Sequence, residues 1–246
     1  MMKKLCLFLF VATCFVTGNS QNYNYDVNGD GVVTAADVTA IYDYLLESSG
    51  HEWVDLGLPS GTLWATMNVG AYYPEGYGDY FAWGETMPKN NYNWQNYKWI
   101  DSEGFFTKYC TLDWAGIVDN KTELDLEDDA AYVNWGPEWR TPTKQQFQEL
   151  INRCTRVWTT RNGINGYLFT ASNGASLFFP AAGGRSNKVL NGLGERGVYW
   201  SRNLECAPDD ENPYAMSFYG PSDEIGGDGL TRCGGVTVRA VRAPQK

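Results

Sequence analysis

The stretch DVNGDGVVTAAD, residues 26–37, carries the most specific pattern of this 246-residue chain. Oxygen-bearing groups recur at alternate positions, and Gly31 stands sixth, where a backbone that wraps an ion must turn sharply. Calcium takes its ligands from loops of this design. The alternative is an acidic turn ahead of a helix. We expect one Ca²⁺ to be held by Asp26, Asn28, Asp30, the Val32 carbonyl, Thr34 and Asp37.

The residues that follow this loop predict a helix. Thr34 and Asp37 have the spacing of a capping box, and apolar residues then recur with helical period as far as Leu45. Residues 26–46 resemble one calcium repeat of a type I dockerin, a resemblance that implies a cohesin-like partner. A dockerin normally pairs two repeats, whereas this sequence shows one, and Ala35 and Ala36 occupy the positions that help to choose the partner. The alternative to binding a cohesin-like partner is that this segment serves as a calcium-stiffened spacer or as a dock for the next domain.

The first twenty residues predict a signal peptide. MMKK is positively charged, residues 5–16 are apolar but too short to span a bilayer, and residues 18–20 form a small-x-small cleavage site. A secreted or cell-surface protein that begins near Gln21 follows from this pattern. The alternative is a lipid anchor on Cys14. We expect no membrane-spanning segment elsewhere in the chain.

Charge narrows the classes of partner. The formal charge of −10 becomes −12 once Lys3 and Lys4 leave with the signal peptide. Nucleic acid and anionic membrane surfaces are poor partners for such a chain. We expect a small calcium-binding segment at residues 21–50 and an independently folded body at residues 51–246, which is long enough to bury a substantial core.

Four cysteines remain after the signal peptide, in a compartment that permits disulfides. They are Cys110, Cys154, Cys206 and Cys233. We expect Cys206 to pair with Cys233, because this link would hold a stretch rich in glycine and aspartate. Buried reduced thiols are the alternative.

The body alternates short extended runs with two helices. Strand-like runs occur at residues 53–56, 62–67 and 78–85, and they return after residue 166. We expect a helix that is capped by Thr143 and has its apolar face toward the core. The acidic run 124–135 should form a second, shorter helix, whose negatively charged start should be exposed to solvent. Most tryptophans, among them Trp64, Trp83, Trp139 and Trp158, should lie in the core.

These blocks resemble the Fibrobacter succinogenes major paralogous domain over roughly residues 52–243. The resemblance rests on VDLGLPSGTLWAT, GDYFAWGET, LEDDAAYVNWG, WRTPTKQQFQELI, NGYLFTASNGASLFFPAAG and VRAVR. Such domains look like members of the C-type-lectin-like group. The resemblance implies an α+β fold of mixed, mostly antiparallel sheets with two helices and long loops, preceded by the EF-hand-like loop and helix.

In lectin-like folds the C-terminal loops present the recognition surface, and here residues 201–235 are polar and glycine-rich. We expect a glycan or protein ligand to contact Trp200, Arg202, Asn203, Tyr214, Tyr219 and Asp223. The calcium-sharing triplets best known in sugar-binding C-type lectins do not occur in the sequence. The alternative function is a dockerin-type component attached to a surface polysaccharide-degrading complex.

Catalysis is not expected. The single histidine, His51, lies in the linker, where we expect it to be solvated, so it offers little for a triad or a zinc site. The acidic residues near Asp128 and Asp129 leave a carboxylate-based glycosidase as the enzymatic alternative.

Overall fold

The structure is a computed structural model that describes residues 34–35, 51–205, 212–222 and 225–243. The chain divides into two compact units, residues 1–50 and 51–246, which are considered separately. The expected calcium loop and its helix lie outside the described residues, apart from Thr34 and Ala35. The fold reported below is that of the second unit.

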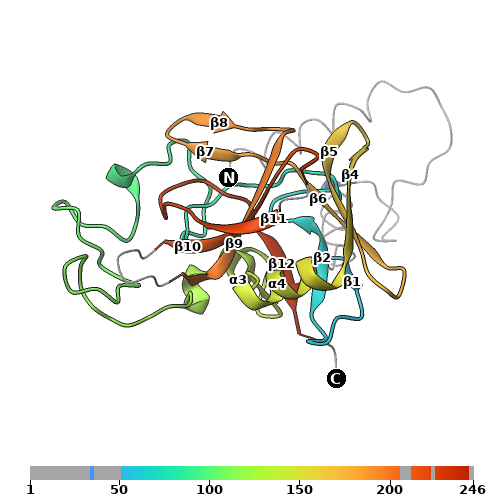
Figure 1. The fold of residues 1–246 in the computed structure, drawn as a ribbon. Helices are drawn as coiled ribbons and strands as arrows, with labels where there is room; N and C mark the ends of the chain where they lie inside the picture. Colours follow the sequence, from blue (N-terminus) through green and yellow to red (C-terminus); the bar gives the residue numbers. More distant parts are fainter. Residues whose placement is uncertain (1–33, 36–50, 206–211, 223–224, 244–246) are drawn as a thin grey trace. The chain divides into compact units, whose positions relative to one another are not determined.

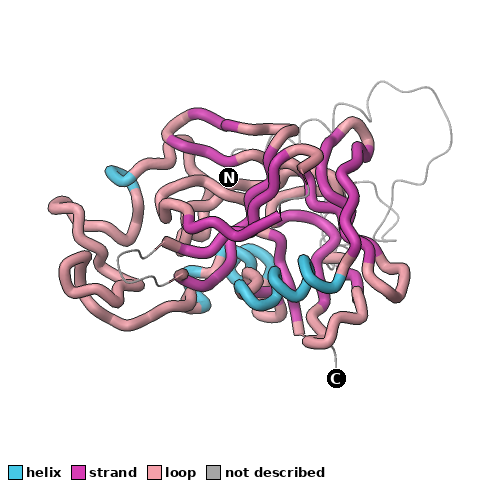
Figure 2. The backbone as a smooth tube through the Cα atoms, in the orientation of Figure 1, coloured by secondary structure: helices cyan, strands magenta, loops and turns pink. Residues whose placement is uncertain are grey.

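The second unit is a mixed α+β fold that consists mostly of antiparallel β-sheet. Every pair of named strands in the described ranges is antiparallel, and the loops between them are long (Figures 1 and 2). The α-helices described are α3 (Ala130–Trp135) and α4 (Lys144–Arg153). Short 3-10 helices, η1 (Trp94–Asn96) and η2 (Leu126–Asp128), lie in the loops before them. This confirms the expected class, whereas the lectin-like topology stays a prediction.

One four-stranded sheet brings the two ends of the body together. Its order is β1 (Trp53–Asp55), β2 (Leu63–Asn68), β12 (Arg239–Arg242) and β3 (Trp139–Arg140). Strand β12 comes from the end of the body and pairs with β2 from its beginning and with β3 from its middle. Residues about a hundred positions apart in the sequence therefore become neighbours at the β12–β3 side of this sheet.

Three further sheets complete the body. One contains β11 (Ile225–Gly229), β10 (Pro213–Tyr219) and β9 (Arg196–Leu204), and another contains β4 (Thr155–Arg161), β5 (Ile164–Thr170) and β6 (Ser176–Pro180). The third is the hairpin of β7 (Gly184–Ser186) and β8 (Val189–Asn191). The loops between β2 and α3 gather beside the β9–β11 sheet, on the side away from the β4–β5 hairpin (Figure 1).

Helix α4 forms as its sequence predicts. The Thr143 hydroxyl accepts a hydrogen bond from the Gln146 amide, and the Gln146 side chain accepts one from the Thr143 amide, so the predicted cap is a complete capping box. Phe147 and Leu150 are fully buried, and Ile151 packs beside them. The helix thus presents its apolar face to a core that also contains residues of β5, β6 and β10.

The GDYFAWGE stretch at residues 78–85 does not form the expected strand. Its backbone runs beside residues 232–236, with mutual hydrogen bonds between Phe81 and Val236, but it makes only an isolated bridge. Gly78 and Gly84 have φ angles of +73° and +76°, a left-handed conformation that breaks a ladder at both ends. The aromatic side chains between them are nevertheless buried, so the segment contributes to the core without joining a sheet.

The tryptophans expected in the core lie there. Trp64, Trp83 and Trp139 are buried. Trp158 is partly buried and packs against the core that contains Phe147 and Leu150, here called the first core cluster. The Trp83 indole donates to the Ser201 carbonyl over 2.8 Å, which satisfies its N–H inside the protein.

Candidate functional site

Two of the residues expected to contact a ligand are core residues. Trp200 is 1% exposed and donates its indole N–H to the Phe81 carbonyl, and Tyr214 is 4% exposed within the first core cluster. Both predictions are wrong because these residues lie on β9 and β10 with their side chains turned into the packed interior. A polar, glycine-rich neighbourhood in the sequence predicts exposed aromatic residues, whereas here these two rings face the core.

The other expected residues are spread over separate places. Tyr219 is 54% exposed, and the Arg196 guanidinium lies 4.7 Å from its ring centroid. The Asn203 side-chain oxygen accepts a hydrogen bond from the Lys144 amide at the start of α4, so this residue also positions the helix. Asp223 lies outside the described residues. Arg202, another residue of the expected set, lines a sizeable cavity.

This cavity, here called the arginine cavity, has a volume of about 640 Å³. Three of its lining residues are Arg140 on β3, Arg202 on β9 and Arg242 on β12. Antiparallel pairing of β12 with β3 sets Val241 opposite Arg140 and so brings the two strands' arginines to one region. The Arg202 amide donates to the Pro142 carbonyl, which brings β9 beside the end of β3.

Arg140 is held by a buried carboxylate. Its Nε donates to Asp129 Oδ2 over 2.8 Å, and its terminal nitrogen donates to the Leu124 carbonyl over 3.2 Å. The Asp129 side chain is fully buried, so the pair is shielded from solvent on that side. This anchoring fixes the Arg140 guanidinium within the cavity wall.

Arg202 and Arg242 have acidic partners that are solvent-exposed. Arg202 Nε lies 2.5 Å from Glu123 Oε1, an ion pair whose angles fall short of a hydrogen bond. Arg242 pairs with Glu138 over 2.7 Å, and its guanidinium lies 5.4 Å from the Trp139 ring centroid. The side chains of Glu123 and Glu138 are 46% and 65% exposed. Exposed pairs of this kind are worth only about 0–1 kcal/mol each.

The remaining wall of the cavity is neutral except for Glu138. Its polar residues are Ser60, Thr62 and Gln146, which are linked to one another: the two hydroxyls lie 2.7 Å apart, and the Gln146 amide donates to the Thr62 hydroxyl over 2.9 Å. Pro137, Val241 and Ala243 supply its apolar surface. The cavity thus offers several hydrogen-bonding groups beside its three guanidinium groups.

A second, smaller cavity of about 180 Å³ lies between the β7–β8 hairpin and residues 230–236. Arg185, Arg196, Tyr92 and Cys233 are among its lining residues. The Cys233 thiol is free and buried, and burial raises its pKa. The structure therefore does not support the expected disulfide with Cys206, which itself lies outside the described residues. Cys154 is also a free and buried thiol, and Cys110 is buried.

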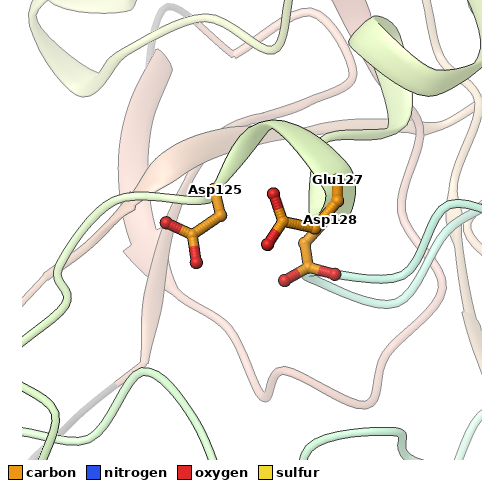
Figure 3. A group of neighbouring side chains, drawn as sticks. All are labelled: Asp125, Glu127 and Asp128. Carbon is orange, nitrogen blue, oxygen red and sulfur yellow. The ribbon is translucent and has the colours of Figure 1, made fainter.

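Among the described residues, three carboxylates on and beside η2 form the cluster most similar to a metal site. Asp125, Glu127 and Asp128 bring their oxygens within 4.8 Å of one another (Figure 3). A lysine ammonium already lies among them: Lys108 Nζ is 2.6 Å from Asp125, 2.6 Å from Asp128 and 3.6 Å from Glu127. Lys98 also pairs with Asp128 and Lys121 with Asp125, so three ammonium groups of the protein balance the three carboxylates.

The acidic run is for the most part not the solvated patch that its composition predicts. Asp128 is buried and accepts bonds from Lys98, Lys108 and the Tyr109 hydroxyl. Asp129 is buried and caps α3 by accepting from the Ala131 and Tyr132 amides. The difference has a physical cause: Lys98 and Lys108 from distant loops satisfy Asp128, and the first amides of α3 satisfy Asp129, so burial is not penalised.

Ion pairing in this cluster should make the body sensitive to acid. Hydrogen bonds from Lys108 and Lys121 lower the pKa of Asp125, and for Asp128 burial alone would raise the pKa, but bonds from Lys108, Tyr109 and Lys98 outweigh it. Because both pKa values are lower in the folded state, this stability is complete above about pH 4, the ordinary carboxyl pKa, and is lost as pH falls through the folded-state values.

The measurement is the urea midpoint of unfolding at pH 6 and at pH 3, for the natural protein and for Lys108→Met. The variant should be less stable at pH 6 and should lose less of its remaining stability on acidification. Lys121→Met, which removes a single partly exposed pair, is the matched control and should behave much like the natural protein. An identical drop in the Lys108→Met variant and the natural protein would contradict this account.

His51 is not the solvated residue that its linker position predicts. Its ring stacks on Trp135 with centroids 3.7 Å apart, and burial lowers its pKa. His51 and the acidic run, from which we expect no catalysis, are thus engaged in packing and ion pairing.

Comparison with known proteins identifies the N-terminal part of the chain. A type I dockerin domain is found at residues 17–56. This range contains the expected calcium loop, and it extends into β1, which pairs with β2 of the body. The match supports calcium binding by this segment, and it supports a role of the chain as a component of an extracellular or cell-surface complex. No curated protein and no solved structure matches the chain.

Within the described ranges, the helices fall short of the length and apolar character that crossing a bilayer requires.

The sequence predicts Arg202 as a ligand contact but not Arg140 or Arg242, although both lie in prominent motifs, WRTP and VRAVR. Each arginine follows apolar strand residues, and only the β12–β3 pairing shows that they share a cavity.

Proposed function

We propose that this chain is an exported recognition protein whose body binds a glycan or protein ligand in the arginine cavity. The observation that carries the proposal is the cavity itself: about 640 Å³, with polar groups from five separate segments of the chain around it. Ligand sites in proteins typically occupy roughly 300–1,000 Å³ and contain a few placed polar groups. The cavity has both properties, and it includes Arg202 from the expected recognition surface.

The N-terminal segment supplies attachment in this proposal. Residues 1–20 direct export, and the loop at residues 26–37 binds one Ca²⁺ through the ligands expected from its sequence. The dockerin match supports a cohesin-like partner for this segment. The protein would then be a component that an extracellular or cell-surface complex holds by its N-terminal part while the body remains available to a ligand.

The proposal includes no catalysis by the body. Asp128 and Asp129, the acids considered for a glycosidase, are bonded to lysine, arginine, tyrosine and backbone groups and are buried. A general acid or base must reach its substrate within hydrogen-bonding distance. Turnover of a polysaccharide that is lost in Asp128→Asn would overturn this part of the proposal.

A substitution that fills the cavity tests recognition without choosing a ligand class. Ala243 is exposed and lines the cavity, so Ala243→Trp should obstruct it while leaving every arginine and its partners in place. We expect ligands captured by the natural protein on glycan and protein arrays to lose at least about tenfold in affinity with this variant, because an indole occupies their space.

The control is Val189→Trp, at an exposed position of β8 that does not line the arginine cavity. It adds the same ring and should retain every ligand. Full retention of the captured ligands by Ala243→Trp, with the variant folded by near-ultraviolet circular dichroism, would show that recognition does not use this cavity.

A further inference from the structure

We infer that the arginine cavity binds the carboxylate of a small hydroxylated acid, of which a sugar acid is the chemical type. This inference rests on the proposed function and adds the class of ligand to it. It is drawn from the charges, the hydrogen-bonding groups and the exposed acidic partners around the cavity.

The guanidinium groups supply the first step. Arg140, Arg202 and Arg242 line one cavity, and a guanidinium group presents a rigid fork of N–H donors that matches a carboxylate in a bidentate arrangement. Arg140 is preorganised because buried Asp129 and the Leu124 carbonyl hold it. A ligand carboxylate therefore meets a donor that is already fixed, which reduces the ordering cost of binding.

Arg242 supplies the second step. Its Nε is buried and has no hydrogen-bond partner among the described residues. A buried donor without a partner costs free energy, and an acceptor delivered by a ligand would remove that cost. The present partner of this arginine, Glu138, is mostly exposed and can turn into solvent when a ligand carboxylate takes its place.

The neutral wall distinguishes a hydroxylated acid from a simple one. Ser60, Thr62 and Gln146 form one linked set, in which the Ser60 hydroxyl also donates to the Glu149 carboxylate and the Gln146 oxygen accepts from the Thr143 amide. A lone pair of the Thr62 oxygen and the second N–H of the Gln146 amide remain for ligand hydroxyls. The apolar lining residues Pro137, Val241 and Ala243 provide no deep hydrophobic pocket of the kind that anchors large peptide side chains. The wall therefore favours a polyhydroxylated ligand over an acidic peptide.

The charge of the whole chain limits the ligand to few acidic groups. At a formal charge of −10, the protein repels extended polyanions at a distance, and the attraction of the arginines acts only at close range. A ligand with one carboxylate gains the arginine contacts without this repulsion. Densely charged polymers are correspondingly disfavoured.

The test uses the full chain and four small probes: D-galacturonate, its methyl ester, D-galactose and succinate. Binding is followed by shifts in protein amide NMR signals during titration. We expect galacturonate to bind at the cavity, and we expect the ester and galactose, which lack the charge, to bind at least about tenfold more weakly. Succinate, which carries carboxylates without hydroxyls, should also be weaker than galacturonate.

Protein variants give an independent arm. Arg242→Gln and Arg202→Gln should each weaken galacturonate about tenfold or more, the effect expected for losing one charge-assisted hydrogen bond. Arg153→Gln is the matched control, since this exposed arginine at the end of α4 makes the same charge change away from the cavity. It should leave the affinity unchanged.

Several results would overturn the inference. One is equal affinity for galacturonate and galactose. Another is an equal loss of galacturonate affinity in Arg153→Gln and Arg242→Gln. The third is tighter binding of succinate or of an acidic peptide than of galacturonate. If the ligands captured on the arrays still lose affinity for the Ala243→Trp variant, the proposed function survives and only the ligand class is wrong. If no ligand responds to Ala243→Trp, the proposed function itself fails.

Discussion

Replacing Asp129 by alanine is expected to destabilise the body by about 3–5 kcal/mol, the cost of removing one partner from a buried ion pair. This is a large part of the roughly 5–15 kcal/mol that a typical domain has in total. The reason is the number of groups that depend on one buried carboxylate. It accepts hydrogen bonds from the Ala131 and Tyr132 amides, the Thr141 amide and hydroxyl, and Arg140 Nε.

These partners lie in two parts of the structure, the start of α3 and the end of β3. The first two amides begin α3, so the substitution removes a helix cap. The Thr141 contacts hold the chain just after β3, and Arg140 lines the arginine cavity. Asp129→Ala should therefore loosen the helix, the edge of the four-stranded sheet and the cavity together.

Urea unfolding followed by tryptophan fluorescence measures this effect. Asp129→Asn keeps an acceptor for the cap but removes the charge that pairs with Arg140, so its loss should be smaller than that of alanine. Glu127→Ala is the matched control from the same acidic run: its side chain is 73% exposed, and we expect a change of at most about 0.5 kcal/mol. Similar losses for Glu127→Ala and Asp129→Ala would contradict this explanation.

The double substitution Asp26→Ala/Asp30→Ala is expected to abolish high-affinity calcium binding. Both residues are expected ligands, and calcium loops depend on the number of charged oxygens that they supply. Removing two carboxylates from one site leaves too few anionic ligands to compensate for dehydration of the ion. The type I dockerin match over residues 17–56 supports calcium binding by this segment.

Calorimetric titration of the mature chain with calcium measures this effect. The natural protein should bind one equivalent of calcium, and the double variant should give no heat beyond dilution. Asp113→Ala removes an exposed acid of the body and should leave the titration unchanged. The urea midpoint of the body should be the same in all three proteins. One full equivalent bound by the double variant would place the ion elsewhere.

Local features of the fold could be predicted from the sequence. The Thr143 capping box and the apolar face of α4 are set by residues close to one another in the chain, and both predictions are confirmed. In these places local pattern and final structure depend on the same short-range physics.

Features that depend on distant partners could not be predicted. Asp128 and Asp129 belong to an acidic run that is expected in solvent, but Lys98, Lys108 and Arg140 meet them from other segments. The arginine cavity forms only because β12 pairs with β3 and β9 lies beside them. The predictions for Trp200 and Tyr214 are wrong for the same reason: a polar neighbourhood in sequence does not reveal which face of a strand is buried.

The two binding functions should respond differently to calcium. The attachment segment is expected to need the ion, whereas the carboxylate cluster of the body already holds Lys108 Nζ, and the arginine cavity is lined by three guanidinium groups. Recognition by the body should therefore proceed without calcium. This separation is the central claim of the proposed function.

The most direct test measures both events on one sample of the mature chain, in calcium and then in excess chelator. Retention on an immobilised cohesin-type partner is read alongside the affinity for galacturonate or for a ligand captured on the arrays. The account predicts that chelation releases the protein from the partner and leaves the ligand affinity unchanged. Loss of ligand binding together with attachment, or attachment that persists in chelator, would contradict it.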